Sequence, residues 1–226
     1  MRLPVFPFLQ RALLRTSLSA LFWCCAAHSG AADTGHLLQN YAAQLLPDSV
    51  VHYASQPEGR QRQRIAGIVH GKNPAERQAL LFVLDLHDDG RMQEILRSAT
   101  FDFSDPSART DIEIVESHGN QRFSLQVNAR SACGVYVSVY RFALIRGEWR
   151  VTGLDTSEPA CGPQQQIEPG TEVSRNFLSG KHITREFRRA KVLRTDIHQH
   201  PYPVFPLQNF AIFDRRYEQE PTVVRP

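Results

Sequence analysis

FSLQVNAR at residues 123–130 and VYVSVYRFALI at residues 135–145 are the two stretches that decide the fold. In the first, apolar and polar side chains alternate, which predicts a strand with one buried and one solvated face. The second is apolar on both faces for most of its length, as in a central strand. Gly147 ends it and residues 149–154 return beside it. This region therefore predicts an antiparallel meander.

The same pattern extends outward from this pair of strands. Asp88-Asp89-Gly90 is a tight-turn signal between LLFVLDL at residues 80–86 and a strand candidate at 92–101. The segments 55–64 and 156–172 are expected to be loops, and a short helical turn is expected after Asn73. The other strand candidates are 65–69, 112–114, 173–178, 183–193 and 207–213.

One helix is predicted, over about residues 34–46. Asp33 or Thr34 can cap it, its apolar residues fall on one face, and Pro47 stops it. No second domain boundary is evident after the helix. The fold class is therefore mainly β (α+β by count), with an antiparallel sheet and one N-terminal helix in a single domain over residues 33–226.

The first 32 residues have the layout of a secretory signal peptide. Arg2, Arg11 and Arg15 precede a short apolar run at residues 18–27, and small residues follow it. The apolar run is about ten residues long, whereas a membrane span needs about 20. We expect cleavage near residue 32 and a mature chain without an integral membrane segment. The expected location is the periplasm, with secretion as the alternative.

Charge argues against nucleic acid as a partner. The signal segment holds three basic residues and no acidic one, so residues 33–226 have 23 basic and 23 acidic side chains, against 26 and 23 in the whole chain. Binding to nucleic acid usually needs a surplus of clustered positive charge. The mature chain is neutral and lacks that surplus.

Two cysteines follow the signal segment, Cys133 and Cys161. An even number of cysteines in an exported chain predicts one disulfide. A reactive thiol or a metal pair is the competing interpretation, but neither cysteine has a Cys-x-x-Cys neighbour or a basic helix start. On the chain-entropy model, the disulfide would stabilise the fold by about 3–4 kcal/mol.

YRF at residues 140–142, WRVTGLD at 149–155 and SRNFLSGK at 174–181 carry a resemblance. The chain resembles a loose group of exported bacterial β-rich proteins of unknown function, whose pattern is YRF, LIGxD, NLLTGK and a closing FD. The closing pair is at residues 213–214, and Val-Thr stands where Leu-Ile is usual. The resemblance covers about residues 79–214. It implies the fold and export, and it carries over no catalytic residue.

Two clusters have the residue types of metal ligands without the spacing. The acidic residues after LLFVLDL lack the oxygen ligands that a calcium loop needs at its third and twelfth positions, so a plain hairpin turn is favoured. Three histidines lack a spacing that fixes a third zinc ligand. We therefore expect no metal and no cofactor. The candidate ligands are Asp85, Asp88, Asp89 and Glu94 for calcium, and His182, His198 and His200 for zinc.

One basic run could form an anion patch: Arg185, Arg188, Arg189 and Lys191. A solvated strand face is the simpler interpretation of such a run. The sequence shows no nucleophile elbow and no phosphate loop. The first hypothesis is therefore a non-catalytic binding or interaction module for a protein or envelope component. The alternatives are a small hydrolase acting on envelope material and an inhibitor or immunity-type protein with one protein partner.

Overall fold

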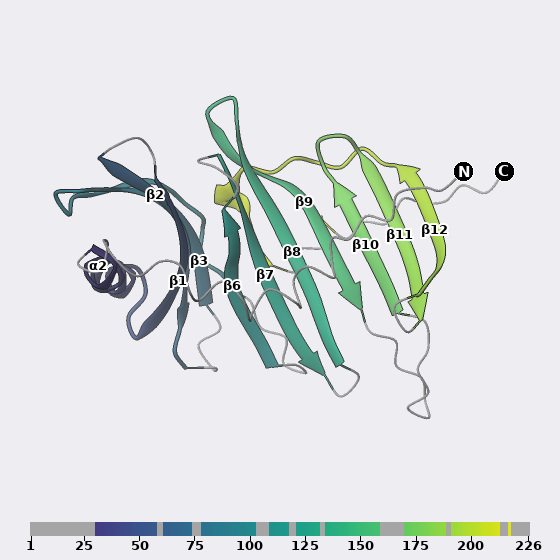
Figure 1. Cartoon of the computed structure of the whole chain (residues 1–226), viewed down its shortest axis with the longest axis horizontal. Helices are drawn as coiled ribbons and strands as arrows, with labels where there is room; N and C mark the ends of the chain where they lie inside the picture. The colour runs from purple at the N-terminus through teal and green to yellow at the C-terminus, as the bar shows by residue number, and fades with distance from the viewer. Residues whose placement is uncertain are drawn as a thin grey trace, which may run out of the picture. The chain divides into compact units, whose positions relative to one another are not determined.

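In its described residues, the computed structural model in Figure 1 has one α-helix, one short 3-10 helix and two antiparallel sheets. The chain divides into two compact units, Met1–Leu38 and Gln39–Pro226, and both sheets belong to the second. Helix α2 (Gly30–Leu45) begins in the first unit and ends in the second. The structure describes residues 30–57, 61–73, 78–102, 109–117, 121–131, 134–158, 170–188, 191–212 and 217.

The first sheet has five strands, in the order β1-β2-β3-β4, and β5 also pairs with β3. All its pairings are antiparallel. The strands are β1 (Ser49–Pro57), β2 (Arg62–Gly71), β3 (Gln78–His87), β4 (Met92–Arg97) and β5 (Phe101–Asp102).

Strand β3 forms the centre of this sheet and is buried on both faces from Ala79 to Leu86, as its continuous apolar sequence predicts. Tyr41, in the second half of α2, packs edge-on against Phe82 with 5.3 Å between the ring centroids. Gly67 lies opposite Phe82 in the register. A Cβ atom at position 67 would lie 2.3 Å from the Phe82 ring, so glycine leaves the space that the end of this ring occupies beside β2.

The second sheet is a meander of seven strands, each paired with the next along the chain (Figure 1). A two-residue hairpin joins β8 to β9 through Arg146 and Gly147, whose φ angles are 51° and 83°. Two positive φ values match the right-handed twist of paired strands. The strands are β6 (Arg109–Ser117), β7 (Arg122–Ser131), β8 (Gly134–Ile145), β9 (Glu148–Glu158), β10 (Gly170–Asn176), β11 (Lys181–Arg188) and β12 (Lys191–Gln199).

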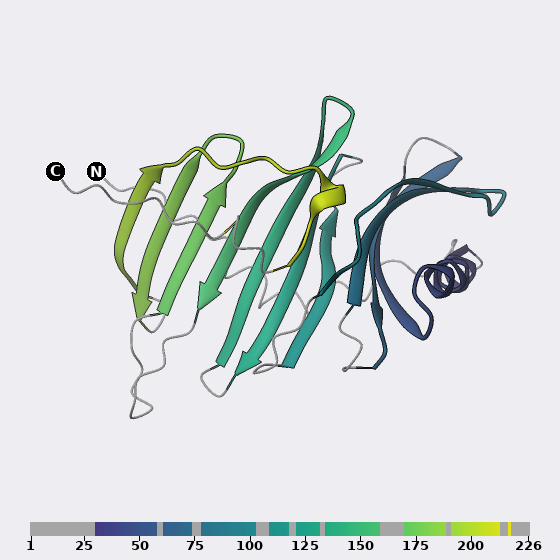
Figure 2. The same cartoon turned by 180° about the vertical axis from the view of Figure 1, so that it is seen from behind.

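Aromatic rings fill the core beneath one face of this sheet. Phe123 and Phe142 stack with 4.5 Å between their centroids. Phe210 meets Tyr140 and Phe142 edge-on at 5.1 and 5.0 Å. Phe210 follows the short 3-10 helix η1 (Leu207–Asn209) in a C-terminal segment that crosses the strand ends from β12 towards β6 (Figure 2). This segment therefore covers the aromatic core.

Over the described residues, the structure confirms the mainly β class, the antiparallel pairing and the single α-helix, and it corrects several boundaries. Residues 183–193 were expected to be one strand but belong to two, β11 and β12. The strand expected at 207–213 is wrong, because its described part contains η1. Both predicted loops are shorter, since β1 and β2 enter the first and β9 and β10 enter the second. The helical turn expected after Asn73 lies outside the described residues.

Within the residues that the structure describes, no helix is long and apolar enough to cross a membrane.

Candidate functional site

Four neighbouring strands bring a row of side chains together on one face of the second sheet. The register places Leu154 of β9 opposite Arg175 of β10, Arg175 opposite His182 of β11, and His182 opposite His198 of β12. Directly opposed residues of antiparallel strands project from the same face. Arg175 and the two histidines therefore share the face that the C-terminal segment partly covers.

Hydrogen bonds at both ring nitrogens hold His182 in place. The residue is 3% exposed, its Nδ1 is hydrogen-bonded to the Tyr202 hydroxyl, and its Nε2 lies 3.0 Å from the Thr184 hydroxyl. In a neutral imidazole one nitrogen donates and the other accepts, and a hydroxyl can satisfy either role. Tyr202 also contacts Phe177, with 5.1 Å between the ring centroids. His182 thus anchors the start of the C-terminal segment to β11.

Arg175 is the unusual member of the row. It is only 5% exposed, and its Nε and Nη1 atoms are buried without a hydrogen-bond partner among the described residues. Its carbonyl oxygen is satisfied, because it accepts a hydrogen bond of 2.9 Å from Arg141 Nη2. A guanidinium stays charged in proteins, and burying a charge without a counter-ion costs several kcal/mol. The arrangement suits an anion brought by a ligand.

The next row on the same face is half-buried and rich in hydroxyl groups. Ser138, Thr156, Val173 and Thr184 lie opposite one another across β8 to β11, and Asp196 continues the row on β12. Alternation along the strand puts this row two residues from the row of Arg175. The buried guanidinium therefore borders a polar surface that solvent reaches.

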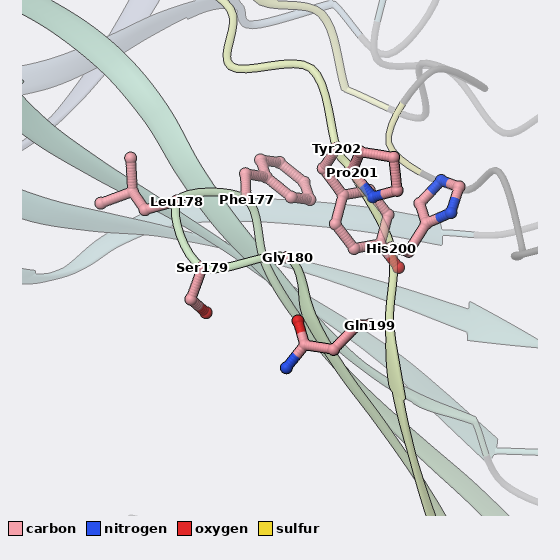
Figure 3. Close-up of a pocket in the computed structure, with 8 residues that line it drawn as sticks. All are labelled: Phe177, Leu178, Ser179, Gly180, Gln199, His200, Pro201 and Tyr202. Atoms are coloured by element: carbon pink, nitrogen blue, oxygen red, sulfur yellow. The ribbon is translucent and has the colours of Figure 1, made fainter.

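A hollow of about 390 Å³ lies between the β10–β11 turn and the C-terminal segment (Figure 3). Asn176 fixes the turn, since its Oδ1 accepts hydrogen bonds of 3.0 Å from the amides of Leu178 and Ser179. The His200 amide donates to the Gly180 carbonyl at 2.8 Å, which ties the turn to the segment. The lining residues are Phe177, Leu178, Ser179, Gly180, Gln199, His200, Pro201 and Tyr202.

The predicted basic patch does not coincide with this site. Arg185 projects from the opposite face of β11, with its guanidinium 3.8 Å from the Glu172 carboxylate. Arg188, at the end of β11, lies opposite Lys191, at the start of β12, and both are exposed. Arg189 lies outside the described residues, as do Cys133 and Cys161.

The acidic residues that were candidate calcium ligands have separate roles in the structure. Asp85 is buried and accepts hydrogen bonds from Arg64 at 2.9 and 3.0 Å and from Arg62 at 3.2 Å. Glu94 accepts the Tyr41 hydroxyl at 2.5 Å. Asp89 accepts the Arg91 amide at 3.0 Å in the hairpin turn, and this hydrogen bond lowers the pKa of its carboxyl. The three carboxylates therefore serve a buried ion pair, the helix contact and the turn.

The histidines also make separate contacts. His182 and His198 have 6.4 Å between their ring centroids. His200 meets Tyr202 edge-on. In the first sheet, the Nε2 atoms of His52 and His70 lie 3.1 Å apart. In the part of the chain that the structure describes, no group of three or more histidine, cysteine, aspartate or glutamate side chains could hold a metal ion.

Comparisons with known proteins give no relative. No protein-family model matches the chain, and no curated protein or solved structure is similar to it. The resemblance to exported β-rich proteins therefore stays a prediction.

Sequence reasoning missed Arg175, although a signal was present. Val173 and Arg175 of β10 and Phe177, just after it, stand at alternate positions, so the arginine lies where a one-sided strand would place a buried residue. Tyr202 gave no comparable signal, because its burial depends on a segment that returns from the end of β12.

Proposed function

We propose that this chain is an exported, non-catalytic binding protein that holds the anionic group of an envelope component at Arg175. The observation that carries the proposal is the burial of Nε and Nη1 of Arg175 without an acceptor among the described residues. A carboxylate or phosphate matches the fork of a guanidinium and restores the missing hydrogen bonds. A ligand that brings the counter-ion would offset the penalty of burying the charge.

The bordering row of hydroxyl groups narrows the class of ligand. Ser138, Thr156 and Thr184 offer donors and acceptors on a half-buried surface beside the arginine. A sugar that carries a carboxylate or phosphate presents an anion together with several hydroxyl groups. We therefore propose an acidic saccharide of the envelope as the ligand class.

Export and the disulfide belong to the same proposal. Cys133 and Cys161 are the two cysteines that follow the signal segment, and an even number of cysteines in an exported chain supports one disulfide between them. Mass spectrometry of unreduced protein should find them linked, and two free thiols would contradict the bond.

The test of the binding function is the thermal stability of Arg175→Met in the presence of ligands. The probes are glucuronate and glucose 6-phosphate, with glucose as the uncharged control. We expect both charged sugars to raise the melting temperature of the wild type, because a ligand that binds only the folded state stabilises it. Arg175→Met should not respond, and without ligand it should melt at or above the wild-type temperature, since a buried charge has been replaced by an apolar side chain.

The matched control is Arg185→Met, an arginine of the neighbouring strand on the opposite face. It should keep the wild-type response to both charged sugars. A wild type that responds to neither charged sugar would contradict the ligand class. A large loss of stability in unliganded Arg175→Met would show that the fold itself pairs this guanidinium, and the binding proposal would then fail.

A further inference from the structure

Strand β12 ends the second sheet, with one edge on β11 and no further strand along its other edge in the described part of the chain. Eight of its nine residues are exposed, and Asp196 alone is intermediate. Val192, Leu193 and Ile197 are 51%, 50% and 58% exposed. An edge strand of this length with apolar side chains is a ready template for pairing with another strand. The sequence of β12 indicates which strand fits.

The sequence of β12 is complementary to itself. A two-fold axis perpendicular to the sheet at Thr195 would place Arg194 of one copy opposite Asp196 of the other, and the reverse. On the other face, Leu193 of one copy would lie opposite Ile197 of the other. Opposite charges and apolar pairs at directly opposed positions both stabilise antiparallel strands. In the single chain, Arg194 Nε lies 2.8 Å from Asp196 Oδ2, so the two charges already project from one face.

Other registers are less favourable. A two-fold axis at Arg194 or at Asp196 would set two like charges directly opposite each other, which destabilises a strand pair. A slip by one residue would pair side chains that project from opposite faces. The axis at Thr195 is the one of these that pairs opposite charges on one face and apolar side chains on the other.

We propose that two copies of this chain pair through β12, antiparallel and centred on Thr195, to join their seven-stranded sheets into one. Such an isologous interface is the commonest arrangement of homodimers. An axis perpendicular to the sheet leaves the Arg175 faces of both copies on the same side. The dimer therefore presents two equivalent faces to one extended partner, although the pairing itself does not rest on what Arg175 binds.

The test is the molar mass of the purified protein by light scattering during size-exclusion chromatography, over a range of concentrations. We expect the wild type to be a dimer. Arg194→Asp and Asp196→Arg should each weaken association by roughly tenfold or more, because each creates two like-charge pairs across the interface. The double variant Arg194→Asp/Asp196→Arg should dimerise again, because its charges are exchanged and remain complementary.

A mixture of the two single variants sharpens the test. One copy then carries two acidic side chains at positions 194 and 196 and the other carries two basic ones, so equimolar mixing should restore a dimer. Arg91→Asp, a change of the same charge at an exposed turn of the first sheet, should remain a dimer. A monomeric wild type would overturn the proposal. So would single variants that dimerise as well as the wild type, or a mixture that stays monomeric while each variant retains the wild-type melting temperature.

Discussion

The two sheets each bury a charged side chain and treat it in opposite ways. Asp85 in the first sheet is 1% exposed and accepts three hydrogen bonds from Arg62 and Arg64. Arg175 in the second sheet is 5% exposed, and its two buried nitrogens have no acceptor in the described structure. Because the degree of burial is nearly the same, the two charges differ in their partners and not in their exposure.

The largest effect is expected when the paired charge is removed. Asp85→Ala should lower the free energy of unfolding by about 3–5 kcal/mol, because it leaves the largely buried Arg64 without its counter-ion. Urea denaturation followed by circular dichroism measures the change. Asp89→Ala is the matched control, since this carboxylate is exposed in a turn, and it should change stability much less than Asp85→Ala. Equal losses in the two variants would erase the contrast between Asp85 and Arg175.

A smaller effect is expected beside the unpaired charge, in the turn that leads from β10 to β11. Gly180 has a φ of 73°, and a Cβ atom there would lie 2.7 Å from the His200 carbonyl oxygen. Gly180→Ala should therefore lower stability by about 2 kcal/mol and detach the C-terminal segment from the turn. Gly90→Ala provides the control, because φ there is 79° but no atom lies within 4 Å of a new Cβ.

Gly90→Ala should lower stability by about 1 kcal/mol, from backbone strain alone. Chemical denaturation of the two glycine variants side by side separates strain from the steric clash. A Gly180→Ala variant no less stable than Gly90→Ala would show that the contact with His200 does not hold the segment.

The smallest effect concerns a neutral group of the first sheet. Burial raises the pKa of Tyr41, and its hydrogen bond to the Glu94 carboxylate raises it further. A raised pKa means that the folded state favours the protonated phenol, so this stabilisation is complete below pH 10, the ordinary value, and is lost as the pH rises above it. Tyr41→Phe should show a weaker decline of stability between pH 9 and 11 in urea titrations. Parallel declines in the two proteins would contradict this role for Tyr41.

Local chemistry made much of the fold predictable from the sequence. Gly90, Gly147 and Gly180 mark turns because each adopts a positive φ. LLFVLDL predicts a buried strand because apolar residues occupy both faces. The same rules predicted a strand over 207–213, where residues 207–209 form a short helix, because they do not show how the chain crosses the ends of other strands.

The candidate site was less predictable, for the same physical reason. The basic run at 185–191 is conspicuous in the sequence, whereas Arg175 stands alone between Ser174 and Asn176. Its importance comes from burial and from the missing acceptor, and both depend on strands β9 and β11 and on the segment that carries Tyr202. Such properties belong to the assembled sheet.

The order of the strands also has a consequence for how the chain folds. Each strand from β6 to β12 pairs with its neighbour in sequence, so each pairing closes only a short loop and contact order within this sheet is low. Phe210 is different, since it contacts Phe101 across more than a hundred residues, and the Ala99 amide donates to Gln208. Hairpins can thus form in succession during synthesis, while the aromatic core closes only after the last described residues arrive. A chain that stops before residue 200 would expose that core, the kind of surface by which chaperones and proteases detect an unfinished protein.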